Sequence, residues 1–141
     1  MTGFRIHPQL VADCHVLGRL GSSHVLLHRN ASVPWFILVP EVAGPDLCDL
    51  DPAARQAVEE EAACIGRFVK AYFGVPRINV AAIGNVVPQL HVHVVGRAPG
   101  DPCWPRPVWG HLDTVESWGA ARLGAVVASL TSRTPLAQDV L

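Results

Sequence analysis

One stretch decides the fold of this chain, residues 84–97, which read Gly-Asn-Val-Val-Pro-Gln-Leu-His-Val-His-Val-Val-Gly-Arg. In an extended strand, successive side chains point to opposite faces. The stretch therefore separates into a polar face (Gln89, His91, His93 and Arg97) and an apolar face (Leu90, Val92 and Val94). Burial of the apolar face fixes the register, because a slip of one residue would bury both imidazoles. We predict a half-buried strand whose polar face presents two imidazoles about 7 Å apart.

Two strands and a helix are predicted before this stretch. Residues 24–29 and 35–39 are apolar runs separated by a turn, which indicates an antiparallel pair. A helix is predicted to begin at Asp51-Pro52, because Asp is a good N-cap and Pro is favoured in the first turn. Its apolar stripe, at spacings of three and four residues, consists of Val58, Ala62, Ile65, Val69 and Tyr72. Gly74 and Pro76 are expected to end the helix.

The remaining elements complete an α+β pattern. Residues 77–83 read as a strand that turns through 84–88 into the His-x-His strand and forms a hairpin with it. After an irregular segment rich in Pro and Trp, a last helix is predicted over about 115–132; its apolar positions are Trp118, Leu123, Val126, Val127 and Leu130. Consecutive hairpins with helices between and after them indicate an antiparallel sheet with a long helix and a C-terminal helix.

The composition is typical of one globular domain, because the chain has 141 residues, half of them hydrophobic, and a formal net charge of −1. Its eleven basic residues are scattered, so charge gives no reason to expect a nucleic acid polymer or an anionic membrane as partner. No apolar stretch approaches the roughly 20 residues of a membrane span. The N-terminus lacks the pattern of a signal peptide. We therefore predict a single cytoplasmic domain over residues 1–141.

The cysteines support the same compartment. Cys14, Cys48, Cys64 and Cys103 lie far apart, and the chain contains no Cys-x-x-Cys motif. In a chain without a secretion signal, this spacing predicts free thiols and no disulfide framework.

Two imidazoles on one strand face are suited to phosphate chemistry or to metal binding. A zinc site needs three or four ligands. No carboxylate lies near the motif, and a third ligand would have to come from one of the distant histidines, namely His7, His15, His24, His28 or His111. We therefore predict no metal and no cofactor, and keep a His-x-His metal site as the less favoured alternative.

The segment 89–95, Gln-Leu-His-Val-His-Val-Val, resembles the signature of the histidine triad (HIT) superfamily, which is His-φ-His-φ-His-φ-φ with φ apolar. Three neighbouring motifs resemble a bacterial branch of that superfamily. They are Pro-Trp-φ-φ-φ-Val-Pro at 34–40, Asn-Val-φ-φ-φ-Gly-Asn-x-Val-Pro-Gln at 79–89, and Asp-Pro-x-Trp-Pro-x-Pro-Val-Trp-Gly at 101–110. The resemblance covers roughly residues 10–112.

The resemblance implies a HIT-like homodimer whose subunit sheets join edge to edge. It also implies a nucleotide substrate, either a nucleoside phosphoramidate or a dinucleoside polyphosphate, that is hydrolysed or transferred at its α-phosphate. By position, His91 is the nucleophile that forms a covalent nucleotidyl-histidine, and His93 contacts phosphate oxygens and helps the leaving group depart. The backbone carbonyl of Gln89 takes the place of the acceptor that holds the nucleophile's ring. Asn30 lies where the family tends to place a ribose-binding residue.

The physical chemistry agrees with these roles. A neutral imidazole is a competent nucleophile near pH 7, and a covalent intermediate divides one difficult displacement into two easier ones. Our hypothesis is that the Gln89 side chain helps to orient His91 and that His93 carries the proton and the charge. Developing charge on the phosphate needs N–H donors, for which Asn85 and the turn amides of 84–86 are candidates.

Two further residues are candidate phosphate or nucleotide contacts. Arg97 lies on the polar face of the strand, and Trp104 could wall the nucleotide site. Aromatic residues favour both ligand sites and dimer interfaces, so Trp104 and Trp109 are assigned to either one.

The chain departs from the family pattern in two places. Gln89 occupies the first position of the triad, and the segment Pro34-Trp35-Phe36 lacks the fourth histidine that many HIT enzymes carry near this strand. Removal of one charge-stabilising donor typically lowers the rate by about 10²–10³. A catalytically weak or inactive nucleotide-binding module is therefore the alternative to an enzyme.

Overall fold

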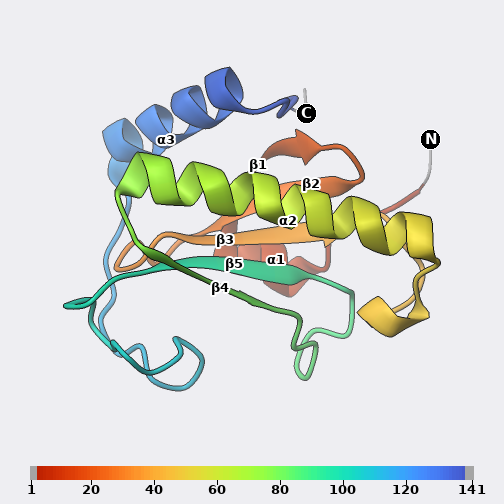
Figure 1. Cartoon of the computed structure of the whole chain (residues 1–141), viewed down its shortest axis with the longest axis horizontal. Coiled ribbons are helices and arrows are strands. Elements are labelled where there is room, and N and C mark those ends of the chain that lie inside the picture. Colours follow the sequence, from red (N-terminus) through yellow and green to blue (C-terminus); the bar gives the residue numbers. More distant parts are fainter. Residues whose placement is uncertain (1–2, 139–141) are drawn as a thin grey trace.

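A computed structural model, which describes residues 3–138, contains one antiparallel sheet flanked by helices (Figure 1). The strands follow the order β1-β2-β3-β5-β4 across the sheet. Their bounds are β1 Cys14–Leu20, β2 Ser23–His28, β3 Trp35–Pro40, β4 Arg77–Ala81 and β5 Val92–Arg97. The helices are α1 Pro8–Asp13, α2 Pro52–Phe73 and α3 Gly119–Arg133, with a short 3₁₀ helix, η1, at Leu47–Asp49. The α+β fold class is confirmed.

The predicted hairpins are present, and three elements were not predicted, namely α1, β1 and η1. β2 pairs with β3, and β4 pairs with β5, each antiparallel. α1 has only six residues, too few to show a helical period in the sequence. β1 carries a register shift between Val16 and Gly18, which breaks the alternation that would have marked it as a strand.

α2 and α3 lie side by side on one face of the sheet, and α2 packs against the apolar side of β5 (Figure 1). Leu90, Val92 and Val94 are buried in this core, so the predicted alternation is confirmed. Gly96 shows how closely α2 approaches β5, because a Cβ there would lie 2.6 Å from Val69 Cγ1. α2 begins where predicted, since the Asp51 side chain accepts a hydrogen bond from the Ala54 amide at 2.8 Å.

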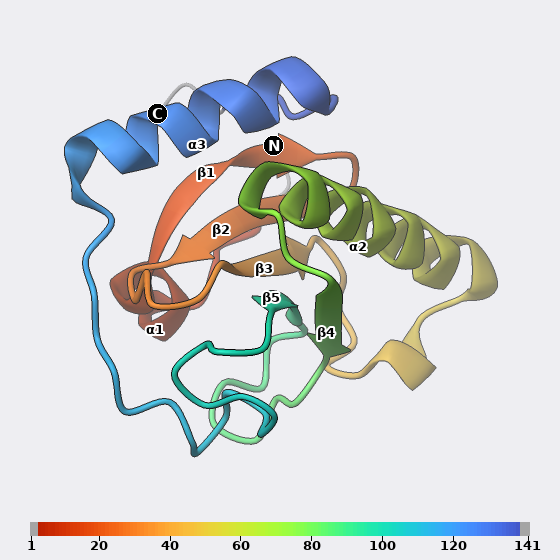
Figure 2. The ribbon, with the colours of Figure 1, turned by 60° about the vertical axis from the view of Figure 1, so that its left-hand side comes forward.

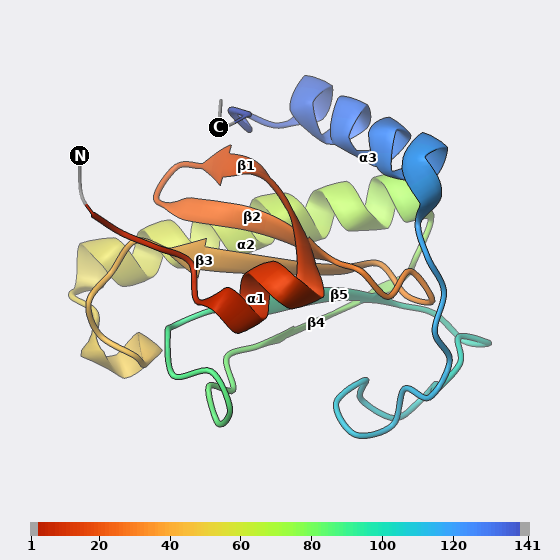
Figure 3. The same cartoon turned by 180° about the vertical axis from the view of Figure 1, so that it is seen from behind.

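The other face of the sheet, predicted to be open, is covered as well. α1 lies over it in Figure 3, and residues 98–118 run around its edge toward α3 in Figure 2. A second apolar core forms there, which includes Leu10 of α1, Trp35 of β3 and Val108 of the loop. His91 and His93 are each only 7% exposed and Arg97 is 2% exposed. The prediction of a half-exposed strand was wrong, because it took no account of covering segments distant in sequence.

The C-terminal helix begins later than predicted, at Gly119 instead of near residue 115. Val115 is 81% exposed, whereas Trp118 is buried and its indole N–H donates to the His28 carbonyl at 2.9 Å. These preceding residues are extended because they hydrogen bond to the β2–β3 turn: the Ala31 amide donates to the Glu116 carbonyl at 2.8 Å.

Two sequence-based expectations can be compared with the structure directly. All four cysteines lie within the described residues and are free thiols, as their spacing predicts. No helix within residues 3–138 is both long and apolar enough to cross a membrane.

Candidate active site

A cavity of about 340 Å³ opens on the sheet face that α1 covers. Its walls come from α1, from β2, β3 and β5, from the turn before the His-x-His motif, and from the loop that precedes α3. The lining residues are Gln9, Leu10, Asp13, His28, Trp35, Ile37, Ile83, Gly84, Asn85, Val86, Val87, His91, His93 and Trp109. Both histidines of the motif and Asn85 therefore share one cavity.

His91 has a defined tautomer. Its Nδ1 lies 2.7 Å from the carbonyl oxygen of Gln89, which can only accept, so Nδ1 carries the proton. The opposite nitrogen, Nε2, keeps its lone pair. The hydrogen bond implied by the family resemblance is present, and it leaves a lone pair on Nε2 of a ring that lines the cavity.

His93 has the opposite tautomer. The indole N–H of Trp35 donates to His93 Nδ1 at 3.0 Å, so the proton of the neutral ring lies on Nε2. Burial, with smaller contributions from the neighbouring His91 and His28 rings, lowers the pKa of His93 to about 3. The two triad rings lie with centroids 4.9 Å apart, because they tilt toward one another. His93 is thus a neutral hydrogen-bond donor at pH 7, and our hypothesis that it carries an ionisable proton needs this correction.

Acid is expected to destabilise the protein through His93. Its folded-state pKa is about 3, whereas the ordinary value is 6.5, so the unfolded chain binds more protons between these pH values. The contribution of His93 to the free energy of unfolding is fully present above about pH 6.5. It falls as the pH is lowered toward 3, by up to about 1.4 kcal/mol per pH unit. Urea unfolding from pH 7 to pH 4, followed by tryptophan fluorescence, measures this slope. His93→Gln should flatten it, and equal slopes in both proteins would rule the mechanism out.

Trp35 stands where the fourth histidine of the family was sought. Its ring stacks on His28 with centroids 4.4 Å apart, and Trp109 packs edge-on against it at 6.0 Å. The donor to His93 is therefore an indole, held between two other aromatic walls of the cavity. Trp109 also packs edge-on against the His93 ring, with ring centroids 5.2 Å apart, so this tryptophan belongs to the site.

Asn85 lies on the rim of the cavity, in the turn that precedes His91. It is exposed, and the preceding Gly84 adopts a positive φ of +66°, which only glycine adopts without strain. The turn thus places Asn85 in the lining of the cavity that also contains His91 and His93.

The side chain of Gln89 does not contact His91. Its Oε1 accepts from the His7 amide and its Nε2 donates to the Arg5 carbonyl, both at 2.8 Å. The proposed orienting role of the side chain is therefore corrected, because only the backbone carbonyl reaches the ring. The Gln89 side chain instead holds the N-terminal segment against the turn by two hydrogen bonds. This segment leads into α1, and α1 forms one wall of the cavity.

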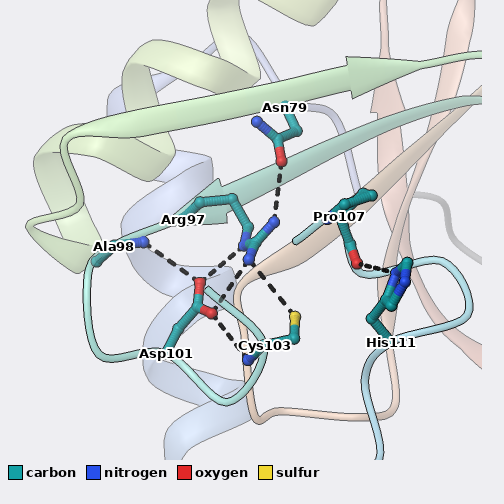
Figure 4. A network of polar contacts seen from close by, with 7 residues as sticks. All are labelled: Asn79, Arg97, Ala98, Asp101, Cys103, Pro107 and His111. Atoms are coloured by element: carbon teal, nitrogen blue, oxygen red, sulfur yellow. Dashed lines mark hydrogen bonds and ion pairs between the residues drawn. The ribbon is translucent and has the colours of Figure 1, made fainter. Parts of the chain in front are cut away.

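Arg97 lies outside the cavity lining, in a buried polar network (Figure 4). Its guanidinium donates to Asp101 at 2.7 and 3.1 Å, to Asn79 Oδ1 at 3.0 Å and to Cys103 Sγ at 3.5 Å. Burial alone would raise the pKa of Asp101, but hydrogen bonds from Arg97 and from nearby backbone amides hold it below its ordinary value. Arg97 therefore stabilises the loop after β5 and is not positioned to contact a phosphate in the cavity.

Trp104 and Asn30 also lie outside the lining. Trp104 is 37% exposed, and the Arg97 guanidinium lies 5.8 Å from its ring centroid. Asn30 stabilises the β2–β3 turn: its side chain donates to the Thr114 carbonyl at 2.9 Å and accepts from the Ser32 amide at 3.1 Å. The ligand contacts expected for these two residues are not supported by their positions.

Sequence reasoning missed His28 as a site residue. It was considered only as a distant metal ligand, yet it lines the same cavity as His91 and His93. Alternation along β2 would have indicated its face, because Leu26 lies two residues earlier in the core that also includes Trp35. Within residues 3–138, no group of three or more His, Cys, Asp or Glu side chains is arranged to hold a metal ion.

Comparison with known proteins places these residues in a family context. The HIT domain model matches residues 9–100. A histidine triad protein from Bradyrhizobium japonicum is 33% identical, with a TM-score of 0.88 over 93% of this chain and 98% of that one. A HIT protein from Sinorhizobium meliloti is 34% identical, with a TM-score of 0.88 over 94% and 98%. One from Marinobacter aquaeolei is 37% identical, with a TM-score of 0.87 over 95% and 98%. No curated protein matches.

Proposed function

This chain belongs to the HIT domain family, and from that premise we propose that it is a nucleotidyl hydrolase or transferase that works through a nucleotidyl-His91 intermediate. The observation that carries the proposal is the pairing of tautomers. His91 presents a lone pair on Nε2, and His93 presents an N–H on Nε2, within one cavity. One nitrogen is prepared to attack phosphorus, and the other is prepared to bind a phosphate oxygen.

The proposed reaction has two displacements at the α-phosphorus. In the first, the Nε2 lone pair of His91 forms an N–P bond, and the bond to the leaving group breaks with its electron pair, while the leaving atom takes a proton from water. In the second, a water oxygen attacks phosphorus, the N–P bond breaks, and the pair returns to Nε2 as the water releases a proton to solvent. Throughout, the N–H donors of His93 and Asn85 stabilise charge on the phosphate oxygens.

The charge of the cavity favours one substrate class. Among the described lining residues there is no lysine or arginine, and the one carboxylate is Asp13. His93 is neutral at pH 7 because its pKa is lowered to about 3. A dinucleoside polyphosphate carries one negative charge on each of its phosphates, and the lining offers no cation to neutralise them, whereas a nucleoside phosphoramidate carries a single negative charge in total. We therefore propose the phosphoramidate class over dinucleoside polyphosphates.

A nucleotide-binding module without turnover is the second candidate. The observation that favours it is the weak acidity of the site: His93 is a neutral donor held by Trp35, and Gln89 offers no imidazole. Such a site binds phosphate oxygens but provides no strong acid for a leaving group.

The experiment that tests the proposal separates both candidates. Adenosine phosphoramidates and diadenosine polyphosphates are incubated with the wild-type protein, AMP release is measured, and acid-quenched samples are examined by intact mass for an adenylyl adduct. AMP release with an adduct on His91 supports the enzyme, with phosphoramidates the faster class. AMP affinity without release or adduct supports the binding module, and neither affinity nor turnover contradicts both.

A homodimer is also proposed. The family resemblance implies sheets joined at their edges, and β4 forms an edge strand whose Val80 is 56% exposed. Light scattering coupled to size exclusion measures the mass directly, and a monomeric mass at micromolar concentration would contradict the dimer.

Replacement of Gln89 by alanine is expected to weaken substrate binding more than chemistry. The variant keeps the backbone carbonyl that orients His91 but loses two hydrogen bonds to the N-terminal segment, each contributing about 0.5–1.5 kcal/mol. We expect KM to rise roughly 3- to 10-fold and kcat to change less than about 3-fold. A kcat that falls 100-fold at unchanged KM would instead show that the side chain acts on the reacting groups.

A further inference from the structure

We propose that His28 is a third working imidazole of this site and donates a hydrogen bond from Nε2 to a non-bridging oxygen of the phosphate attacked by His91. The inference rests on the proposed function and deepens it. It assigns a residue that lies outside the His-x-His motif and that the motif alone does not indicate.

The register of the sheet places His28 beside the other two imidazoles. Leu27 of β2 pairs with Phe36 of β3, so His28 follows directly at the level of Trp35. The stacked rings of His28 and Trp35 confirm this, with centroids 4.4 Å apart. Trp35 in turn bonds His93, so the three side chains form one continuous layer that lines the cavity.

The tautomer of His28 is determined by its own backbone. The Asn30 amide donates to His28 Nδ1 at 3.0 Å, so the proton of the neutral ring lies on Nε2. Among residues 3–138 no protein group hydrogen bonds to that Nε2 atom, and His28 lines the cavity. The ring is therefore held in the state of a donor whose acceptor must come from outside the chain.

Burial keeps this donor neutral. It lowers the pKa of His28, and the nearby Asp13 carboxylate only partly opposes that effect. His28 and His93 then act alike, as two neutral N–H donors beside one nucleophilic nitrogen. This arrangement supplies a second donor on the side of Trp35, whose own N–H is already committed to His93.

His28→Ala and His28→Gln test the proposal. Gln retains a side-chain N–H, whereas Ala retains none. In single-turnover reactions with an adenosine phosphoramidate, we expect alanine to slow adduct formation by about 10²–10³ with KM nearly unchanged, and glutamine to recover at least about 10-fold of that loss. An alanine variant as fast as wild type, or a glutamine variant as slow as alanine although both fold, would overturn the proposal.

A binding measurement separates this proposal from the proposed function. Wild-type protein labelled with ¹⁵N-histidine is titrated with AMP, and the Nε2 resonances are followed. A shift of the His28 Nε2–H signal on AMP binding supports the contact even if no substrate is turned over. No shift at His28, while His91 or His93 responds, overturns the contact even in an active enzyme. His111→Ala is the matched control, since His111 is exposed, lies outside the cavity lining, and its ring donates to the Pro107 carbonyl (Figure 4).

Discussion

His91→Ala is expected to abolish both AMP release and the adenylyl adduct, with a loss of at least about 10⁴ in kcat. Among the three imidazoles that line the cavity, the variant removes the one whose Nε2 lone pair is left free, because its Nδ1 donates to the Gln89 carbonyl at 2.7 Å. The other two imidazoles of the cavity accept hydrogen bonds at Nδ1 and carry their protons on Nε2, so neither can replace the nucleophile. Steady-state turnover and intact mass after acid quench provide the measurement.

The same experiment requires a folded variant and a neutral control. Nucleotide affinity of His91→Ala should stay within a few-fold of wild type, because the donors on His93 and Asn85 remain. His111→Ala should retain full turnover, since that ring is exposed and lies outside the cavity lining. Residual turnover above a tenth of wild type in His91→Ala would show that the covalent route does not pass through this residue.

Asp101→Ala is expected to lower the free energy of unfolding by about 3–5 kcal/mol, which is a fall in Tm of roughly 10–20 °C. The Arg97 guanidinium is 2% exposed and would lose the carboxylate that accepts two of its hydrogen bonds (Figure 4). A buried cation without its counter-ion is among the most destabilising changes a single substitution makes. Thermal and urea unfolding measure the loss.

Two further variants test this explanation. Asp113→Ala removes an exposed carboxylate in the same loop and should change stability by less than about 0.5 kcal/mol. Arg97→Met combined with Asp101→Ala removes both charges and should recover much of the loss, because an apolar pair needs no counter-ion. A double variant no more stable than Asp101→Ala would show that the network stabilises by shape and not by charge.

The spacing of apolar residues in the sequence was sufficient to predict the helix and the strand that bury one regular apolar face. α2 follows from its cap and its period, and β5 follows from alternation, because in both the residue spacing and the buried face agree. The family resemblance implies the acceptor of the His91 ring, and the structure places that acceptor two residues earlier in the chain, just before β5. Such features depend on near neighbours, which the sequence displays.

The rest depended on partners distant along the chain. The Gln89 side chain bonds residues more than 80 positions earlier, and Trp118 bonds a carbonyl 90 positions away. Arg97 was predicted as a phosphate contact, because its burial requires Asp101 and Asn79 to meet it in three dimensions. His28 was considered only as a distant metal ligand, since it comes next to the two triad histidines only when β2 and β5 flank β3.

The indole of Trp35 limits proton transfer to and from His93. A histidine at that point could donate at one pH and accept at another, and so could relay protons to and from His93. An indole N–H only donates and does not titrate. It therefore keeps His93 Nδ1 as an acceptor and the proton of the neutral ring on Nε2. Trp35 therefore cannot pass protons to or from His93, and we expect the proposed reaction to exchange its protons with water in the cavity.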